Sequence, residues 1–180
     1  MDLGVPGHLP VLNRDGLRQA LRACSLLSCK IQPSLVFDRK HYVYHDLPIG
    51  YQITQHRHPI GFEGTFQSIP ISRIQLETDT AKLLNEHDGQ CMLDFNRSGL
   101  ALIEIVTEPQ FSSVDSVVSF VTALNSQLSK YDIIDRNIED GSFRIDVNVN
   151  IQLESKEFPT KKKKNIMGFK FLQQALEFEY

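Results

Sequence analysis

The stretch "SGLALIEIVTEP", residues 98–109, places one acidic residue in an aliphatic run. Two aliphatic residues stand on each side of Glu104, and a run of this kind predicts a strand that is buried on both faces. Burying an ionised carboxylate costs several kcal/mol unless a positive partner meets it. The sequence therefore predicts a cationic partner for Glu104.

Three segments have the apolar spacing of helices. Residues 14–29 follow Asn13, a typical N-cap residue, and residues 112–131 open with two serines that are also suited to capping. A third helix begins within the final "FKFLQQALEFEY". The expected buried stripes are Leu17, Ala20, Leu21, Cys24 and Leu27 in the first helix, and Val114, Val117, Val118, Val121, Leu124 and Leu128 in the second.

Two segments predict strands. In residues 67–77 the apolar side chains change face near Arg73, which leaves Arg73, Gln75 and Glu77 on one side. Residues 143–153, "FRIDVNVNIQL", alternate strictly between apolar and polar, and "NEHDGQ" (85–90) predicts a turn. The predicted fold class is therefore α+β, an antiparallel sheet covered by helices on one side, in a single domain over residues 1–180.

Composition excludes several broad classes. The chain has 180 residues, a net charge of −3 and 41% hydrophobic residues, so it has no overall positive field for nucleic acid or anionic lipid. Its three cysteines have no C-x-x-C spacing, which argues against a disulfide framework or a zinc ribbon and favours a reducing compartment. No apolar run reaches the roughly 18 residues of a membrane helix, and the first residues match no signal or transit peptide.

Carboxylates lie at or near several predicted strands. If these strands are neighbours in one sheet, the acids converge on its polar face and suit Mg²⁺, which prefers oxygen ligands. Arg97, Arg144 and Lys82 would then hold an anionic group, as phosphoryl transfer requires. The acids concerned are Glu77, Asp79, Asp94, Glu104, Glu139, Asp140 and Asp146.

A structural interpretation of the same residues stays open. Glu104 would pair with Arg97, Arg144 or another base, or would lie on an edge strand facing water. Composition alone favours this interpretation, because acids on strands are common and the chain has no Walker-type glycine loop. The histidines have no H-E-x-x-H spacing, and His56 and His58 are interpreted as loop residues.

Six ordered motifs span nearly the whole chain. They are "PGHLPVLN" (6–13), "FDRKHYVYHDLPIGYQITQ" (37–55), "RIQLETDTAK" (73–82), "DFNRSGLALIEIVTEP" (94–109), "EDGSFRIDVNV" (139–149) and "KNIMGF" (164–169). Together they resemble the GatB family, the B subunits of glutamyl-tRNA(Gln)/aspartyl-tRNA(Asn) amidotransferases. Six motifs in one order are far more specific than any one of them.

The resemblance implies an ATP-dependent and Mg²⁺-dependent activity. GatB-like subunits phosphorylate the side-chain carboxylate of a glutamate or aspartate wrongly attached to tRNA, and ammonia from the GatA amidase subunit displaces the phosphate. The implied partners are GatA, a GatC-like subunit and misacylated tRNA, with no membrane. The implied fold is the GatB cradle domain, which is similar to the glutamine synthetase and guanidino kinase fold.

The resemblance also assigns site residues by position. Glu104 and Glu77 match metal-binding carboxylates, and "FDRKxYxY" matches Asp38, Arg39, Lys40 and Tyr44, which are interpreted as a structural loop beside the site. The implied catalytic residues are Glu77, Asp79, Glu104 and Arg144, and the implied cofactor-binding residues are Lys82, Asn96, Arg97, Glu139 and Asp146.

Departures from the family pattern limit what is expected of the chain alone. Thr78 replaces the second acid of "EEDAGK", Thr80 and Ala81 replace its Ala-Gly pair, Asp140 replaces a glutamate and Lys162 replaces an acid. The family's opening strand "GLEVHVQL" and its C-terminal helical and tail domains have no counterpart here. We therefore expect a partial GatB sequence whose chain as written has little activity alone.

Three points stay open at this level. The alternative function is a non-catalytic, shortened GatB paralogue that serves as a GatA-docking scaffold, and a stand-alone RNA-binding module is a weaker third. The substrate is either Glu-tRNA(Gln) or Asp-tRNA(Asn), because both share one activation chemistry. The divergent signatures favour the mitochondrial matrix, with bacterial cytoplasm as the alternative.

Overall fold

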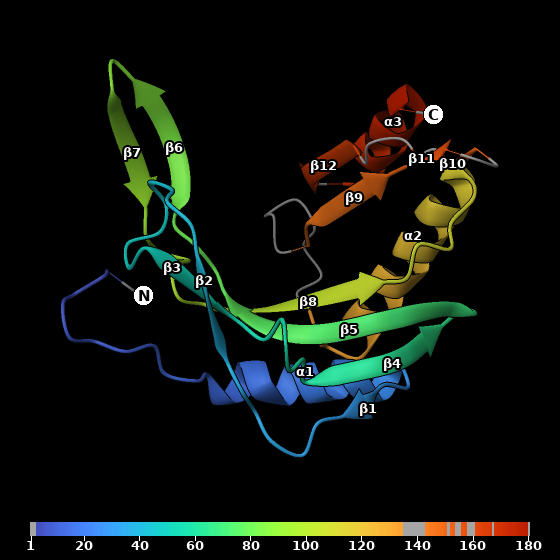
Figure 1. Cartoon of the computed structure of the whole chain (residues 1–180), viewed down its shortest axis with the longest axis horizontal. Coiled ribbons are helices and arrows are strands. Elements are labelled where there is room, and N and C mark those ends of the chain that lie inside the picture. The colour runs from blue at the N-terminus through green and yellow to red at the C-terminus, as the bar shows by residue number, and fades with distance from the viewer. Residues whose placement is uncertain are drawn as a thin grey trace. The chain divides into compact units, whose positions relative to one another are not determined.

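The computed structural model describes residues 3–134, 143–150, 152–153, 156–157, 161–166 and 168–179. The chain divides into two compact units, Met1–Glu108 and Pro109–Tyr180 (Figure 1). The first unit contains α1 (Arg14–Leu26), β1 (Lys30–Ile31), β2 (Asp38–His41), β3 (Tyr51–Thr54), β4 (Gly61–Phe66), β5 (Ile69–Thr78), β6 (Lys82–His87), β7 (Gln90–Asp94) and β8 (Ala101–Thr107). The second contains α2 (Val114–Lys130), β9 (Ile145–Val149), β10 (Gln152–Leu153), β11 (Lys156–Glu157), β12 (Lys161–Ile166) and α3 (Phe169–Glu179).

Helix α1 begins where the sequence predicts. The Asn13 side chain accepts a hydrogen bond of 2.9 Å from the backbone N–H of Gly16, so one of the unpaired donors of the first turn is satisfied. Ala20, Cys24 and Leu27 of the predicted stripe are buried and Leu17 is half-buried, which confirms most of that stripe. Leu21 is a correction, because it is exposed on the solvent side of the helix.

The central sheet of the first unit is antiparallel, with strand order β1-β4-β5-β8. Figure 1 shows α1 along one face of this sheet. Gly61 and Gly64 of β4 allow the close approach, because a Cβ on Gly61 would lie 2.5 Å from Cys24 Sγ and one on Gly64 would lie 2.3 Å from Cys29 Sγ. This confirms an antiparallel sheet with helical cover on one face.

Strand β5 changes face where the sequence predicts. Its pairing with β8 shifts register between Ile71 and Arg73, and Glu63 of the adjacent strand has a φ of 49°. Ile71 and Ile74 are both almost fully buried, although residues three positions apart in a regular strand point to opposite faces. An irregularity of this kind turns the strand, so Arg73, Gln75 and Glu77 are left together on the other face.

Side chains of β3, and of Gln55 directly after β3, hold the end of β5. Strand β4 stops pairing at Ile74, which would leave backbone groups of Leu76 and Thr78 without a strand partner on that side. Gln55 Oε1 accepts from the Leu76 N–H at 3.0 Å, and Gln52 Nε2 donates to the Thr78 carbonyl at 2.8 Å. Both glutamines are buried, and these backbone contacts explain why.

Two hairpins flank the sheet. Strand β2 pairs with β3, and β6 pairs with β7 around Asp88 and Gly89, whose φ angles of 49° and 73° suit a tight hairpin turn. The predicted turn at residues 85–90 is therefore confirmed, although the strands on both sides of it were not predicted. Every residue of β6 is exposed.

Strand β8 corrects the expectation about Glu104. In the four-stranded sheet it is an edge strand, paired with β5 alone, and Glu104 is exposed. The strand is therefore not buried on both faces, and the alternative of an edge strand facing water matches this position.

The second unit packs α3 against α2 and against the β9–β12 pair. Ser113 caps α2 by accepting from the Ser116 N–H at 3.3 Å, and the predicted stripe of α2 is buried or half-buried. Lys161 and Lys163 of β12 contact Glu179 at 2.7 and 2.8 Å, and their hydrogen bonds and charges hold the pKa of that carboxyl below its ordinary value.

The predicted strand at 143–153 is corrected in two respects. It is not one strand, since β9 pairs with β12 whereas β10 pairs with β11. It is also not a neighbour of β5 and β8 in one sheet, so the premise that all the acids share a sheet face is wrong. The alternation itself is confirmed in β9, where Asp146 and Asn148 are exposed and the apolar residues are half-buried.

The structure supports the α+β class in its coarser form, as a mixed fold with antiparallel sheets. The likeness to the glutamine synthetase fold and the single domain over residues 1–180 stay predictions. Among the described residues, no helix combines the length and the hydropathy that a membrane crossing requires.

Candidate functional site

The polar face of β5 is organised around the side-chain amide of Gln75. Arg73 Nε donates to Gln75 Oε1 at 3.1 Å, and because a guanidinium only donates, this contact fixes which end of the amide is the oxygen. Gln75 Nε2 then donates towards Glu77 Oε1 at 3.0 Å and towards Glu104 Oε2 on the paired strand. One amide nitrogen therefore lies between two carboxylates.

Glu77 is surrounded by neutral donors. Its Oε1 also accepts from the Thr54 hydroxyl at 2.7 Å, and its Oε2 accepts from Gln52 Nε2 at 3.3 Å. Gln52, Thr54 and Gln75 are buried, whereas Glu77 is half-buried and Glu104 is exposed. Amides and a hydroxyl thus hold the Glu77 carboxylate in place and leave the Glu104 side of the pair accessible.

Tyr42 lies beside this network and close to further acidic residues. Its hydroxyl donates to Gln52 Oε1 at 3.1 Å. Burial, followed by the charges of Asp46, Glu77 and Asp79, raises the pKa of Tyr42 to about 12. Asp46 Oδ2 accepts from the Thr80 hydroxyl at 2.9 Å, while among the described residues no donor reaches the buried Asp46 Oδ1.

Asp79 and Arg97 connect the end of β5 to the turn before β8. Arg97 Nε lies 3.7 Å from Asp79 Oδ2 and donates to the Thr80 carbonyl at 3.2 Å. The Asp79 backbone exchanges two more hydrogen bonds with this turn, of 2.7 and 2.9 Å, through Leu100 and Gly99. Arg97 therefore orders the segment that follows Glu77.

The other predicted residues take no part in the hydrogen bonds described for this network. Lys82 is exposed at the start of β6, opposite Asp94, and Asn96 is exposed in the turn, where its N–H donates to Asp94 Oδ1 at 2.8 Å. Arg144 and Asp146 belong to the second unit, and Glu139 lies outside the described residues. The anion clamp of Arg97, Arg144 and Lys82 stays a prediction.

The "FDRK" segment has structural contacts. Asp38 accepts from Arg57 Nε at 2.6 Å and from the Arg57 backbone N–H at 3.1 Å, and these bonds lower the pKa of Asp38. Arg39 stacks over the Tyr51 ring at 4.9 Å, and Lys40 lies 5.4 Å from the Tyr42 ring centre. Tyr44 is largely exposed.

Sequence reasoning missed the neutral residues of the site. Gln52, Thr54 and Tyr42 carry no charge, and although all three lie in the motif at 37–55, they were given no role. A usable signal was present in "YQIT", where Gln52 and Thr54 alternate on one face of a short strand. Gln75 was placed on the correct face but was given no function.

The donor chemistry of this face fits Mg²⁺. Glu77 and Glu104 offer carboxylate oxygens on either side of one amide nitrogen, and Mg²⁺ is commonly held by one or two carboxylates with several waters. Among the described residues no donor reaches the buried Asp46 Oδ1, so this region holds an unsatisfied acceptor. Thr78 does not compete for the oxygens of Glu77 and Glu104, because its hydroxyl bonds elsewhere: it accepts from the Ile53 N–H at 3.3 Å.

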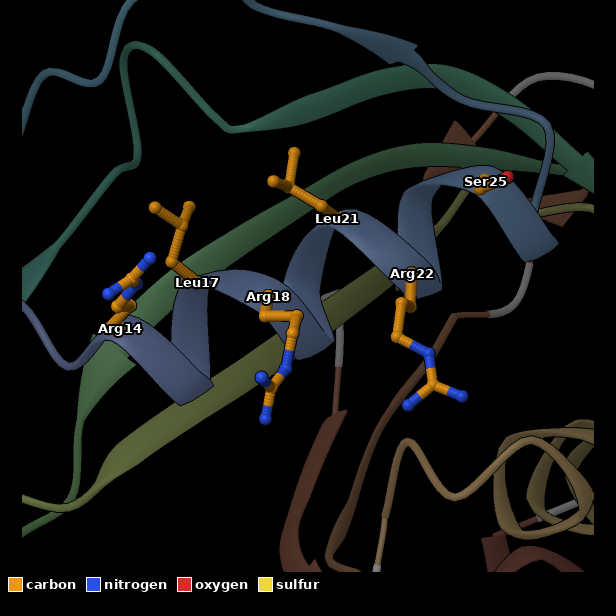
Figure 2. A pocket seen from close by; sticks show the side chains of 6 residues that line it. All are labelled: Arg14, Leu17, Arg18, Leu21, Arg22 and Ser25. Carbon is orange, nitrogen blue, oxygen red and sulfur yellow. The ribbon is translucent and has the colours of Figure 1, made fainter.

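A shallow hollow on α1 is a different feature. Figure 2 shows that its lining comes from α1 alone: Arg14, Leu17, Arg18, Leu21, Arg22 and Ser25. Arg18 contacts Asp15 at 2.9 Å, and Arg22 donates to Gln19 at 3.0 Å. We interpret it as the solvated face of an amphipathic helix, and it contains none of the predicted site residues.

Known proteins resemble the chain over its whole length. The family model of the GatB/GatE catalytic domain matches residues 1–180. Proteins named as the B subunit of aspartyl/glutamyl-tRNA(Asn/Gln) amidotransferase are similar to it: that of Malacoplasma penetrans is 42% identical over 99% of this chain and 39% of its own length, and that of Bacillus pumilus is 40% identical over 99% and 40%. The corresponding Ehrlichia chaffeensis protein is 41% identical, and the chain spans about two fifths of the length of these relatives. The chain belongs to the GatB/GatE catalytic domain family.

Proposed function

We propose that the chain carries the carboxylate-activating step of a tRNA-dependent amidotransferase. The relatives are named as the B subunit of an enzyme acting on aspartyl- and glutamyl-tRNA. The observation that carries the proposal is the pair of carboxylates, Glu77 and Glu104, on one face of paired strands with the Gln75 amide between them.

The proposed reaction has two steps. An oxygen of the substrate's side-chain carboxylate attacks the γ-phosphorus of ATP, the bond to the bridging oxygen breaks, and ADP leaves. Ammonia then attacks the acyl carbon, inorganic phosphate leaves, and the excess proton passes to solvent. The first step assembles anions, so it requires positive charge close to the phosphates.

In this proposal Glu77 and Glu104 hold Mg²⁺, which when bound neutralises phosphate charge. Glu77 and Glu104 would be the protein ligands of that ion, and the hydrogen bond from Arg73 keeps the Gln75 amide beside them. Gln52 and Thr54 keep the Glu77 carboxylate oriented, because both donate to it from β3. Arg97 acts as a positioning residue through its bond to the Thr80 carbonyl.

The partners follow from the same proposal. Ammonia comes from a GatA amidase subunit in a complex with a GatC-like subunit, and misacylated tRNA is bound by parts of the family beyond this catalytic domain. Lys82 and Asn96 are exposed near the turn that precedes β8, so both are accessible to a nucleotide or tRNA phosphate. Removing either one is expected to weaken binding rather than folding.

Calorimetric titration of the full chain with Mg²⁺ and ATP tests the proposal. Glu104→Gln and Glu77→Gln are expected to weaken Mg²⁺-dependent binding about tenfold or more, since each removes one carboxylate ligand. Glu108→Gln is the matched control, because Glu108 is exposed just after β8 and outside the network. Equal binding in all variants would reject the carboxylate pair, and no binding by the unsubstituted chain would favour the non-catalytic scaffold.

A further inference from the structure

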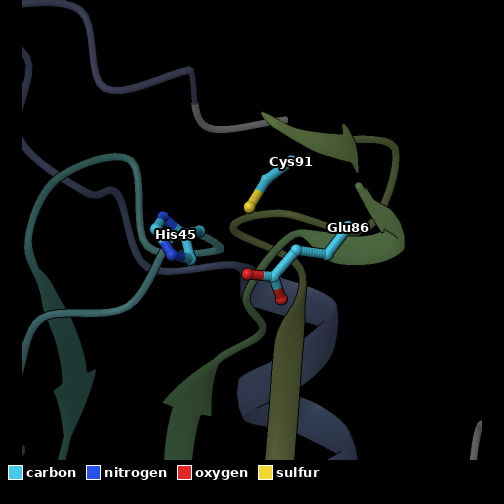
Figure 3. Close-up of side chains that lie close together, drawn as sticks. All are labelled: His45, Glu86 and Cys91. Carbon is cyan, nitrogen blue, oxygen red and sulfur yellow. The ribbon is translucent and has the colours of Figure 1, made fainter. Parts of the chain in front are cut away.

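Three different metal-ligating side chains meet beside the β6–β7 hairpin. Ligand atoms of His45, Glu86 and Cys91 all lie within 4.8 Å of one another (Figure 3). The three residues are up to 46 positions apart in the sequence, so a search for short metal-binding motifs does not find this group. The carboxylates of the Glu77 network are not part of this group.

Backbone pairing between β6 and β7 fixes the positions of Glu86 and Cys91. Glu86 and Cys91 are direct partners in the antiparallel register of β6 and β7. Side chains of directly opposed residues share a face of the hairpin, with Cβ atoms about 5 Å apart. The tight turn at Asp88 and Gly89 closes the hairpin only two residues beyond Glu86, so this register is well determined.

The third side chain is anchored through its chain neighbour. His45 lies in the loop between β2 and β3, and the next residue, Asp46, is held twice: its carbonyl accepts from the Ala81 N–H at 2.8 Å and its Oδ2 accepts from the Thr80 hydroxyl at 2.9 Å. Leu47 is buried directly after it. The loop is therefore attached immediately before β6 begins, which brings His45 to the hairpin.

We propose that His45, Glu86 and Cys91 form a binding site for a borderline divalent cation of the Zn²⁺ type. Imidazole, carboxylate and thiolate are the three ligand classes that Zn²⁺ accepts, whereas Mg²⁺ and Ca²⁺ prefer oxygen alone. Three protein ligands leave a fourth tetrahedral position for water or another ligand. His45 and Glu86 are exposed and Cys91 is half-buried, so an ion can reach the site from solvent.

The other two cysteines give an internal contrast. Burial raises the pKa of Cys24 to about 12 and that of Cys29 to about 11, so both thiols stay protonated at neutral pH. Only a thiolate ligates these metals well. A thiolate–metal signal from the chain should therefore come from Cys91.

Cobalt substitution of the full, reduced chain tests the site directly. Titration with Co²⁺ is expected to produce a thiolate-to-cobalt charge-transfer band with one equivalent per chain, and added Zn²⁺ should displace it. Cys91→Ser should abolish the band, and His45→Ala or Glu86→Gln should weaken Zn²⁺ binding by about 10- to 100-fold. Cys29→Ser and His56→Ala are the matched controls and should keep both the band and the affinity.

A second measurement needs no variant. Zn²⁺ should protect Cys91 of the unsubstituted chain from alkylation by iodoacetamide, read residue by residue by mass spectrometry, whereas Mg²⁺ should not. Protection of Cys91 by Zn²⁺ alone supports the site. The proposal is overturned by a Co²⁺ band that survives Cys91→Ser, by loss of the band in Cys29→Ser, or by alkylation of Cys91 at the same rate with and without Zn²⁺.

Discussion

One face of β5 packs against α1, whereas the other carries the hydrogen-bond network of Glu77 and Glu104. On the apolar face Ile71, Ile74 and Leu76 are at most 3% exposed. On the polar face the partners are amides, a hydroxyl and an arginine. Close packing makes the first face sensitive to single atoms, while the second face depends on which donors and acceptors are present.

The largest expected effect is on the apolar face, from Gly64→Ala. The added Cβ would lie 2.3 Å from Cys29 Sγ and 2.7 Å from the Leu27 carbonyl oxygen, and the latter belongs to the backbone and cannot rotate away. We expect the free energy of unfolding to fall by about 3 kcal/mol, measured by urea denaturation. A loss below about 0.5 kcal/mol would show that β4 and the turn that follows α1 are not packed this closely.

Gly61→Ala is the control that separates side-chain clashes from backbone clashes. Its new Cβ would lie 2.5 Å from Cys24 Sγ, and every other neighbour is at least 3.3 Å away. Cys24→Ala removes that sulfur, so the double variant should be more stable than the sum of the single effects predicts. For Gly64→Ala, Cys29→Ala should give less recovery, because the Leu27 oxygen remains.

The second prediction concerns the polar face. Gln75→Leu leaves Arg73 without its acceptor and removes the donor shared by Glu77 and Glu104. We expect a loss of about 2 kcal/mol in the free energy of unfolding, because partly buried polar groups lose their partners. The effect should shrink when Glu104→Gln is present, since one of the two charges is then gone, and an equal loss in both backgrounds would argue against the shared amide.

A smaller effect is expected at the start of α1, which covers the apolar face. Asn13→Ala removes the acceptor for the Gly16 N–H and should cost about 1 kcal/mol in thermal or urea unfolding. Asn13→Asp keeps an acceptor at the same place and should stay within about 0.5 kcal/mol of the unsubstituted chain. Equal losses in both variants would mean that the side chain packs rather than caps.

The difference between the two faces also explains what sequence reasoning achieved. The helices and the face change at Arg73 were predicted correctly, because hydrophobic periodicity records which side of an element is buried. Periodicity does not record which strands pair. The convergence of acids depended on the strand at 143–153 sharing a sheet with the strand of Glu104, whereas β9 pairs with β12.

Sequence reasoning named the charged residues of this network but gave its neutral residues no role. Glu77 and Glu104 were predicted as metal ligands, and that role stays a prediction. The residue that donates to both of them, Gln75, is an ordinary strand residue in the sequence. Glu104 was expected to be buried because its neighbours are aliphatic, but an edge strand exposes it. The His45–Glu86–Cys91 group depends on loop docking and hairpin register, which sequence spacing does not encode.

The smallest expected effect appears at alkaline pH, through Tyr42 at the border of the polar face. Because burial and the neighbouring carboxylates raise its pKa from 10.0 to about 12, this phenol should ionise late among the five tyrosines in the sequence. Absorbance titration of the phenolate should show that late step in the unsubstituted chain and in Tyr44→Phe, whose side chain is largely exposed, but not in Tyr42→Phe.

The sign of the stability effect follows from the same shift. A pKa that is higher in the folded state means that the folded chain keeps its proton when the unfolded chain has lost it. The contribution of Tyr42 is therefore complete below pH 10 and is lost as pH rises through about 12. Tyr42→Phe should flatten the fall in the free energy of unfolding over that range. An unchanged slope would mean that neither burial nor the charges of Asp46, Glu77 and Asp79 raise the pKa of this phenol.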